Sequence, residues 1–353
     1  MSTFGKHYEV SLFGASHEQY IGITIHNYPC GVEIDTKLIA RRLALRRGMQ
    51  DLTSARHEED DFEIISGYFQ GKTTGAPLTV LVRNFNQKSQ DYPDPNLIRP
   101  AHADYTYYHK YHGFHDYRGG GSASGRLTVA LVVLGALCEQ VLAGKGIIVA
   151  SRMKSIEKIS DLDPKITPEL LKNWQEDSFP VFSETAKAAM LATISRTKAE
   201  KDSVGGIVET YIYNLPIGLG EPFFDSFESI LAHLIFSIPG VKGLEFGRGF
   251  AISSLHGSEA NDQLRYENAA VVRSSNNSGG IEGGITTGSP VIFRTAFKPT
   301  PSIGKPQKTI NLRLGENSEI EIHGRHDAII AIKGLHVVNA LAWYAIMEMM
   351  SYE

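Results

Sequence analysis

The sequence predicts an α+β protein in which helices pack between antiparallel sheets. Segments with strand character do not alternate regularly with helical ones, as they would around a parallel sheet. No G-x-G-x-x-G motif follows a strand and no G-x-x-x-x-G-K-S/T motif occurs, which disfavours Rossmann and P-loop domains. Apolar residues make up 42% of the 353 positions and charged residues 21%, so the chain can bury a sizeable core.

Apolar periodicity near 3.6 residues predicts four helices and a weaker fifth. The first starts at a capping residue and stops at Gly48. The second is apolar on most of its faces, so we expect it to be buried on several sides. The predicted helices are 36–47, 126–142, 184–201, 335–349 and, more weakly, 223–236.

Short runs rich in β-branched and aromatic residues predict the strands. No linker, repeat or low-complexity tract divides the chain, so we expect a single domain over 1–353. The predicted strands are 8–13, 22–25, 78–82, 147–150, 206–213, 249–253, 291–297 and 319–323.

Composition also limits the location and the partners. The longest uncharged apolar run, 127–138, is shorter than the roughly 20 residues of a membrane span, and 1–7 lacks an apolar signal segment. Two cysteines, Cys30 and Cys138, cannot build a disulfide framework or a four-sulfur metal site. A formal charge of −4 argues weakly against non-specific binding to nucleic acid. We therefore expect a cytoplasmic protein that binds neither membrane nor nucleic acid.

Two basic or titratable segments near the N-terminus are candidates for chemistry. His17 follows a predicted strand, where it could donate a proton near neutral pH, although most histidines in proteins are structural. Arginine pairs at 41–42 and 46–47 lie at a helix C-terminus. They suit the negative end of the helix dipole and anion binding equally well.

The densest candidate segment is 99–126, which contains four histidines, five tyrosines and three arginines. His109, His112 and His115 are spaced three apart but have no intervening Glu, so the zinc interpretation is weak. Three glycines at 119–121 followed by Ser-x-Ser open a helix, which is typical of an anion cradle. An ordinary capped helix is the alternative.

Two later segments complete the set. Paired glycines at 279–284 would let backbone approach a flat ring, with Lys298 and Ser302 supplying a charge and a hydroxyl. A glycine-rich hairpin fits those glycines equally well. Asp327, flanked by Arg325 and His326, could act as a base or form an ion pair.

These segments, in this order, resemble the chorismate synthase family over nearly the whole chain. One such motif would be weak, but about a dozen in register are specific. They include S-G-x-x-x-G-x-T-T-G at 66–75, Q-x-S-x-D-Y at 87–92, H-A-D-Y-T at 102–106, D-Y-R-G-G-G at 116–121, V-K-G at 241–243, F-G-x-G-F at 246–250, N-D at 261–262, G-G-I-E-G-G at 279–284, K-P-T-P-S-I at 298–303 and G-R-H-D at 324–327.

The resemblance implies an activity and a fold. The family converts 5-enolpyruvylshikimate 3-phosphate into chorismate and phosphate by an anti-1,4-elimination that requires reduced FMN, a step of the shikimate pathway to aromatic amino acids. The family fold is a β-α-β sandwich, usually assembled as a homotetramer. The resemblance leaves open whether the chain reduces its own FMN with NADPH or receives it from an external flavin reductase.

The resemblance also implies roles for individual residues. His17 would protonate the leaving phosphate, His102 would serve the flavin N1 side, and Asp327 with Ser124 nearby would assist removal of the C6 proton. No metal ligand is implied. The candidates for binding the substrate anions are Arg46, Arg47, Arg99, Arg118, Arg126 and Lys333. The residues that would hold FMN are Ser122, Ala123, Ser124, Pro239, Gly240, Gly283, Lys298, Pro299, Thr300, Pro301, Ser302 and Arg325.

Several positions depart from the family's usual pattern. The glycine before the second catalytic histidine is Ala101, and an arginine after Asp327 has become Lys333. Other departures are Ala15, Glu18, Ser122, Ala123, Gly125 and Leu127. They support an alternative, a divergent non-catalytic or repurposed paralogue that binds flavin or another anion.

Overall fold

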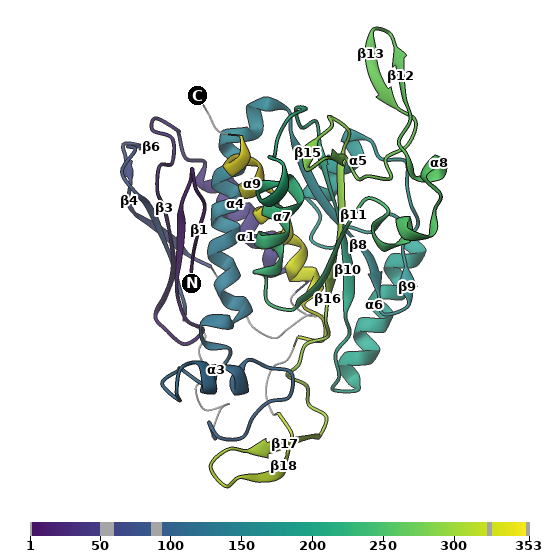
Figure 1. The fold of residues 1–353 in the computed structure, drawn as a ribbon. Helices are drawn as coiled ribbons and strands as arrows, with labels where there is room; N and C mark the ends of the chain where they lie inside the picture. Colours follow the sequence, from purple (N-terminus) through teal and green to yellow (C-terminus); the bar gives the residue numbers. More distant parts are fainter. Residues whose placement is uncertain (1, 50–59, 86–93, 323–326, 351–353) are drawn as a thin grey trace.

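The protein consists of two antiparallel sheets with a layer of helices between them (Figure 1). The computed structural model describes residues 2–49, 60–85, 94–322 and 327–350. Apolar side chains of both sheets and of the helices between them form one continuous core. The predicted α+β class, with helices between antiparallel sheets, is confirmed.

The first sheet is formed by the N-terminal part of the chain. Its central strand alternates between two faces, and Ile21, Ile23 and Ile25 are all buried. The strands, in spatial order, are β1 (Thr3–Phe4), β2 (Val10–Gly14), β3 (Tyr20–Ile25), β7 (Leu78–Arg83) and β4 (Phe62–Ser66).

The second sheet is built from the middle and C-terminal parts of the chain. Its outer face is partly covered by two helices, α5 (Pro168–Gln175) and α6 (Glu184–Ala199) (Figure 1). The strands, in spatial order, are β11 (Val241–Phe246), β16 (Val291–Phe297), β10 (Gly206–Tyr213), β8 (Ile148–Ile156) and β9 (Ile159–Ser160).

Four helices fill the space between the sheets: α1 (Thr36–Arg47), α4 (Thr128–Leu142), α7 (Phe227–Phe236) and α9 (Ala331–Met349). Helix α4 packs on β3 and β7, while α9 packs on β8 and β10, and the two helices contact each other. Gly135 makes this crossing close, because a Cβ there would lie 2.3 Å from the Cα of Ala340.

One helical stretch, Gly125–Lys145, is long and apolar enough to cross a membrane. In this fold 67% of its most apolar window is buried inside the protein. Helix α4 is therefore a core helix of the protein, as its apolar character on several faces predicts.

The local sequence signals determine where the best-predicted helix begins and ends. The side chain of Asp35 accepts hydrogen bonds from the backbone N–H groups of Lys37 and Leu38, at 2.9 and 3.0 Å. The helix ends at Gly48, whose φ of +68° favours glycine. The predicted range 36–47 is confirmed.

Some predicted boundaries are wrong. Segment 249–253 is a 3₁₀ helix, Gly249–Ser254, rather than a strand. Gly249 has φ +57° and the Glu245 carboxylate accepts the Phe250 N–H, so the chain folds back over the end of β11. Strand β18 (Glu316–Ile320) begins before the predicted 319–323, because it pairs with β17 (Gln307–Asn311) across a short turn. Residue 323 lies outside the described residues.

Other elements were extended, shortened or not predicted. Helix α9 begins four residues earlier than predicted, α4 starts after a 3₁₀ turn, Gly125–Leu127, and α6 ends at Ala199. Strand β8 continues through charged residues to Ile156. Elements not predicted are β1, β4, β9, β11, β17, α5, the short helices α3 (Asp104–Lys110) and α8 (Gly257–Ala260), and the strand pairs β5 (Tyr68–Phe69) with β6 (Lys72–Thr73), β12 (Leu264–Glu267) with β13 (Ala270–Arg273) and β14 (Ile281–Glu282) with β15 (Ile285–Thr286).

Candidate active site

A pocket of about 390 Å³ lies where β2, α3, α4, α7 and the ends of β11 and β16 meet. It brings together segments that are more than 100 residues apart in the sequence. Six of the residues predicted to hold the cofactor line it: Ser122, Ala123, Ser124, Pro239, Gly240 and Lys298. Tyr107, Leu127 and Phe236 are among the other lining residues.

The charge of this pocket is positive. Lys242 and Lys298 line it, and no aspartate or glutamate is among the lining residues in the part of the chain that the structure describes. Burial, and then the neighbouring charge of Lys242, lower the pKa of Lys298 below that of an ordinary lysine. An anionic ligand would relieve this repulsion. Small residues, apolar walls and two ammonium groups together fit a flat group that carries a phosphate.

The glycine-rich turn at 119–121 supports the loop that carries His17. Gly119 and Gly121 have φ of +60° and +52°, and the Gly121 carbonyl accepts the Ser16 N–H at 3.0 Å. The Ser16 hydroxyl donates to the Arg118 carbonyl at 3.0 Å and lies 3.0 Å from Nδ1 of His17. Because that hydroxyl proton is used, Nδ1 of the buried His17 is the donor to Ser16.

His102 is held by a carboxylate on the adjacent short helix. Its Nδ1 lies 2.7 Å from Oδ1 of Asp104, and Arg99 forms a bidentate pair with the same carboxylate. Nη2 of Arg99 also donates to the Gly119 carbonyl at 2.6 Å. The turn at 119–121 therefore connects the two predicted histidines. The loop of His17 contacts this turn on one side, and Arg99, which holds Asp104 and His102, contacts it on the other.

Ala101 has φ +56°, a left-handed conformation that costs an alanine about 1–2 kcal/mol. Its carbonyl accepts a 2.7 Å hydrogen bond from Nζ of Lys298, which ties the His102 loop to the pocket.

Replacing Ala101 with glycine is expected to raise the free energy of unfolding by about 1 kcal/mol. Denaturant titration measures this. The matched control is Ala103→Gly at φ −75°, which should not stabilise. A loss of stability in Ala101→Gly would contradict the assignment of strain.

The predicted substrate arginines are paired with aspartates. Arg46 and Arg126 both approach the buried carboxylate of Asp60, and Arg126 makes the closer contact. Arg118 forms a bidentate pair with Asp116, and Arg99 with Asp104. Two arginines on one aspartate leave a net charge of +1 beside α4. Arg47 is half-buried at the end of α1.

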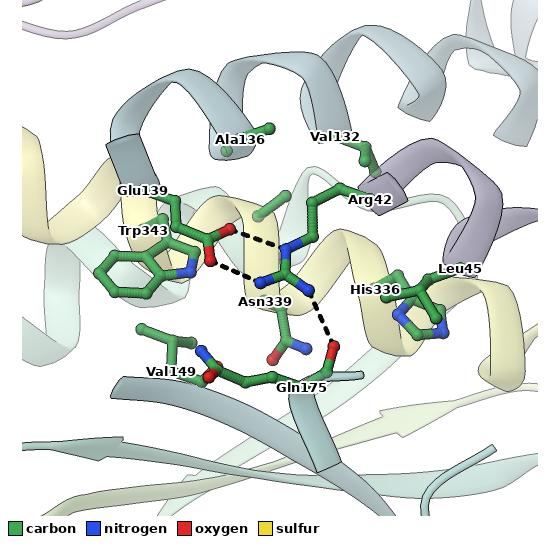
Figure 2. Close-up of a pocket in the computed structure, with 12 residues that line it drawn as sticks. Arg42, Leu45, Val132, Ala136, Glu139, Val149, Gln175, His336, Asn339 and Trp343 are labelled. Atoms are coloured by element: carbon green, nitrogen blue, oxygen red, sulfur yellow. Dashed lines mark hydrogen bonds and ion pairs between the residues drawn. The ribbon is translucent and has the colours of Figure 1, made fainter. Parts of the chain in front are cut away.

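Arg42 serves the core rather than an anion site (Figure 2). Its guanidinium donates to both oxygens of Glu139 on α4, at 2.8 and 2.5 Å, and to the Gln175 carbonyl at 2.9 Å. The adjoining cavity is only about 30 Å³, roughly the space of one water molecule. The charge of Arg42 is therefore paired with a carboxylate of the neighbouring helix, an interaction that neither sequence interpretation named.

The remaining predicted residues are more dispersed. Asp327 lies 3.2 Å from Nζ of Lys333, just before α9, and Ile330 on the next turn would meet a Cβ at Gly240. Pro299, Thr300, Pro301 and Ser302 follow Lys298 but do not line the pocket. Gly283 is next to the N-terminal end of α7, whereas the pocket is at the C-terminal end, about 15 Å away along a ten-residue helix. Arg325 lies outside the described residues.

No group of three histidine, cysteine, aspartate or glutamate side chains suited to a metal ion occurs among the residues that the structure describes. Helix α3 ends at Lys110 and His112 has φ +53°, so His109 and His112 do not share a helical face. The spacing of three residues is therefore not the spacing of a metal site.

Sequence reasoning did not single out four residues that shape the site: Asp60, Asp104, Tyr107 and Lys242. Asp104 and Lys242 lie within the H-A-D-Y-T and V-K-G motifs, so the sequence did contain a signal for these two residues. Asp60 has no local signal. Its importance comes from its burial against Arg46 near the end of α1 and against Arg126, which is 66 residues away in the sequence.

Comparison with known proteins gives consistent matches over the full length. The family model described as chorismate synthase matches residues 8–351. The chain is 41% identical to the chorismate synthase of Thermococcus kodakarensis over 98% of this chain and 96% of that protein. It is also 41% identical to the one of Chitinophaga pinensis, over 100% and 97%. A solved structure titled "Crystal Structure of Chorismate Synthase" superposes with a TM-score of 0.75 at 25% identity, covering 98% of this chain and 92% of the other.

Proposed function

This chain belongs to the chorismate synthase family and is a carbon–oxygen lyase, and from that premise we propose its substrate, cofactor and site. The reaction is the anti-1,4-elimination of phosphate from 5-enolpyruvylshikimate 3-phosphate, which yields chorismate and requires reduced FMN. The cationic pocket of about 390 Å³, lined by six of the predicted flavin residues, supports this assignment most directly.

FMN would be held by six residues that line the pocket: Ser122, Ala123, Ser124, Pro239, Gly240 and Lys298. When bound in reduced form, it supplies electron density to the allylic system as phosphate departs. The pocket residues position it and balance its negative charge. Burial and paired lysines make this balance stronger than it would be in water.

The proton transfers are assigned to the chain's own residues. Ser16 orients His17 by accepting a hydrogen bond from its Nδ1, so the imidazolium form of His17 would deliver the proton on Nε2 to the leaving phosphate. Asp327, with Lys333 beside it and Ser124 on the pocket wall, receives the proton from C6. His102 would serve the flavin N1 side through Nε2.

The substrate's phosphate and carboxylates require positive charge, and we assign this role to five of the six predicted cations. Arg118 is the most accessible of the arginines with a described ion pair to an aspartate, since its side chain is 38% exposed. Arg46 and Arg126 act through the net charge left after Asp60 is neutralised. Arg47 and Lys333 complete this set, whereas Arg99 is paired with Asp104.

Flavin binding should depend on the protonation of Lys298. Because the pKa of Lys298 is lowered by burial and by Lys242, FMN affinity is expected to fall as pH rises, beginning below the range of ordinary lysines. Lys242→Met should move this fall to higher pH, since the repulsion is gone. Fluorescence titration of oxidised FMN against pH measures both, with Lys308→Met on an exposed strand as the control. Identical pH profiles for all three proteins would contradict the assignment.

The assembly proposed is a homotetramer of single-domain chains in the cytoplasm. Strands β12 and β13 form a projecting two-stranded hairpin (Figure 1), on which the Tyr266 side chain is 81% exposed. An isolated two-stranded hairpin is marginally stable in water, so contact with another copy would stabilise it. Sedimentation equilibrium would give four chains; a monomer would refute this assembly.

Turnover is the decisive test of the proposed function. Protein, pre-reduced FMN and 5-enolpyruvylshikimate 3-phosphate are mixed without oxygen, and chorismate and phosphate are measured. Chorismate formation supports the proposal. FMN binding without phosphate release, by folded protein, would instead support the repurposed paralogue. Omitting added reductant and supplying NADPH with oxidised FMN then separates an intrinsic reductase from an external one.

A further inference from the structure

We infer that Asp104 and Arg99 form a positioning pair, which fixes the proton of His102 on Nδ1 and leaves Nε2 to face the ligand. The inference rests on the proposed function for the role of His102 in catalysis. The geometry of the pair stands independently of it. Arg99, predicted as a substrate ligand, then acts through Asp104 instead.

The contacts of Asp104 occupy both of its oxygens. Oδ1 accepts from Nη2 of Arg99 at 2.6 Å and lies 2.7 Å from Nδ1 of His102. Oδ2 accepts from Nε of Arg99 at 2.7 Å and from the Arg99 backbone N–H at 3.1 Å. Four donors around one carboxylate define its orientation, and His102 must approach it with an N–H.

Burial favours this arrangement. The side chains of Arg99, Asp104 and His102 are only 9%, 15% and 16% exposed. Burial alone would raise the pKa of Asp104, but the hydrogen bonds and charges of His102 and Arg99 outweigh it and hold that pKa well below its usual range. Asp104 is therefore ionised across the physiological range, and only an ionised carboxylate accepts from all four donors.

The opposite side of the imidazole is available to a ligand. Within the described part of the chain, Nε2 of His102 has no hydrogen-bond partner. The neighbouring carbonyl of Ala101 is held by Lys298, which lines the pocket. A carboxylate on Nδ1 fixes the tautomer and the plane of the ring, as carboxylates do for the histidines that bind metal ions.

The pair also links the two histidines. Nη2 of Arg99 donates to the carbonyl of Gly119, the glycine that touches Ser16 and His17. Displacing Arg99 would therefore disturb both loops. This coupling explains why a positively charged residue of the substrate set is directed away from solvent, with a side chain only 9% exposed.

Asp104→Asn is the informative substitution. An amide has one oxygen, and Arg99 can only donate. Placing the amide nitrogen at the Oδ2 position would lose two hydrogen bonds from Arg99, whereas placing it at the Oδ1 position would lose one. The second orientation directs an N–H at Nδ1 of His102. The variant is therefore expected to move the His102 proton to Nε2.

Solid-state ¹⁵N NMR of histidine-labelled protein at alkaline pH reports this tautomer directly, with His102→Gln identifying the signal. The wild-type protein should show protonated Nδ1, and Asp104→Asn protonated Nε2. Turnover by Asp104→Asn is expected to fall by about 10- to 100-fold in kcat with little change in KM. Asp104→Glu, which keeps the charge, should restore the Nδ1 proton and part of kcat.

Asp202→Asn is the control, because Asp202 is also ion-paired, with Lys305 at 2.7 Å, but lies outside the site. It should leave the His102 signal unchanged. An unchanged tautomer in folded Asp104→Asn would overturn the inference. If Asp104→Asn shifts the tautomer but the wild-type protein forms no chorismate, the proposed function is refuted and the positioning pair still holds.

Discussion

Replacing Gly119 with alanine is expected to lower turnover by about 100-fold or more, since misplacing a catalytic group by about 1 Å costs that much. A Cβ at Gly119 would lie 2.7 Å from Oγ of Ser16 and 2.9 Å from Cε1 of His17. Both side chains are buried, so the imidazole must move. Steady-state turnover with reduced FMN measures the loss.

The control for this substitution is Gly315→Ala, in the turn between β17 and β18. Its φ of +66° is close to the +60° of Gly119, but no atom lies within 4 Å of the added Cβ. Both variants should lose about 1–2 kcal/mol of stability from the left-handed conformation, and only Gly119→Ala should lose activity. Equal turnover in the two variants would remove His17 from the mechanism.

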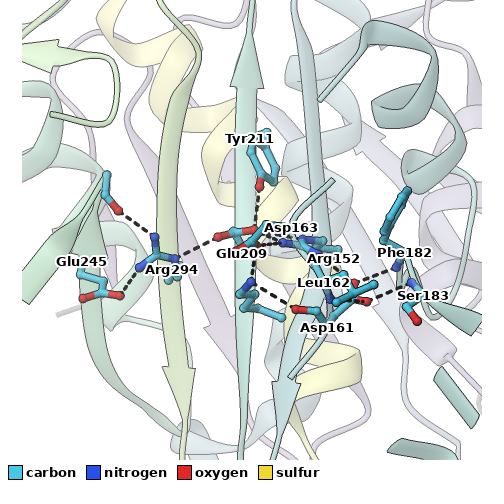
Figure 3. Close-up of polar contacts among 12 residues, drawn as sticks. Arg152, Asp161, Leu162, Asp163, Phe182, Ser183, Glu209, Tyr211, Glu245 and Arg294 are labelled. Carbon is cyan, nitrogen blue, oxygen red and sulfur yellow. Dashed lines mark hydrogen bonds and ion pairs between the residues drawn. The ribbon is translucent and has the colours of Figure 1, made fainter. Parts of the chain in front are cut away.

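Replacing Arg152 with methionine is expected to lower the free energy of unfolding by about 3–5 kcal/mol at neutral pH. Arg152 is fully buried on β8 and binds the carboxylates of Asp161, Asp163 and Glu209, at 2.7–2.8 Å (Figure 3). Methionine would preserve much of the volume but leave the carboxylates of Asp161 and Glu209 buried without this partner. Urea denaturation at one fixed protein concentration measures the difference.

The difference should shrink in acid. Burial alone would raise the pKa of Glu209, but the charge of Arg152 and hydrogen bonds from Tyr211, Arg152 and Arg294 lower it overall. A carboxylate with a lowered pKa stabilises the folded state above its unfolded pKa and loses that contribution as pH falls. The wild type should therefore lose more stability than the variant below about pH 4.5.

The control is Arg265→Met, which removes an exposed ion pair and should lower the free energy of unfolding by at most about 1 kcal/mol. A loss that small in Arg152→Met would refute the buried network.

Much of the secondary structure was predictable because its signals are local. Asp35 and Gly48 limit α1, and the predicted ranges 206–213 and 291–297 coincide with β10 and β16. The errors arose where distant pairing overrides composition. Strand β8 continues past Ala150 through Arg152, because carboxylates from β10 and the following loop compensate the buried charge. Segment 249–253 has strand-like residues, yet a bond to Glu245 folds it back.

The sequence by itself determined the α+β class, the family and six of the residues that line the pocket, because motif order and apolar periodicity are properties of the chain alone. Only the tertiary structure decided which charges meet. Asp60 forms ion pairs with two of the predicted substrate arginines, and Asp104 binds Arg99 and His102. Gly283 lies at the end of α7 that is far from the pocket. The reason is physical: the energy of an ion pair depends on distance and burial, and for partners far apart in the chain both are set by packing.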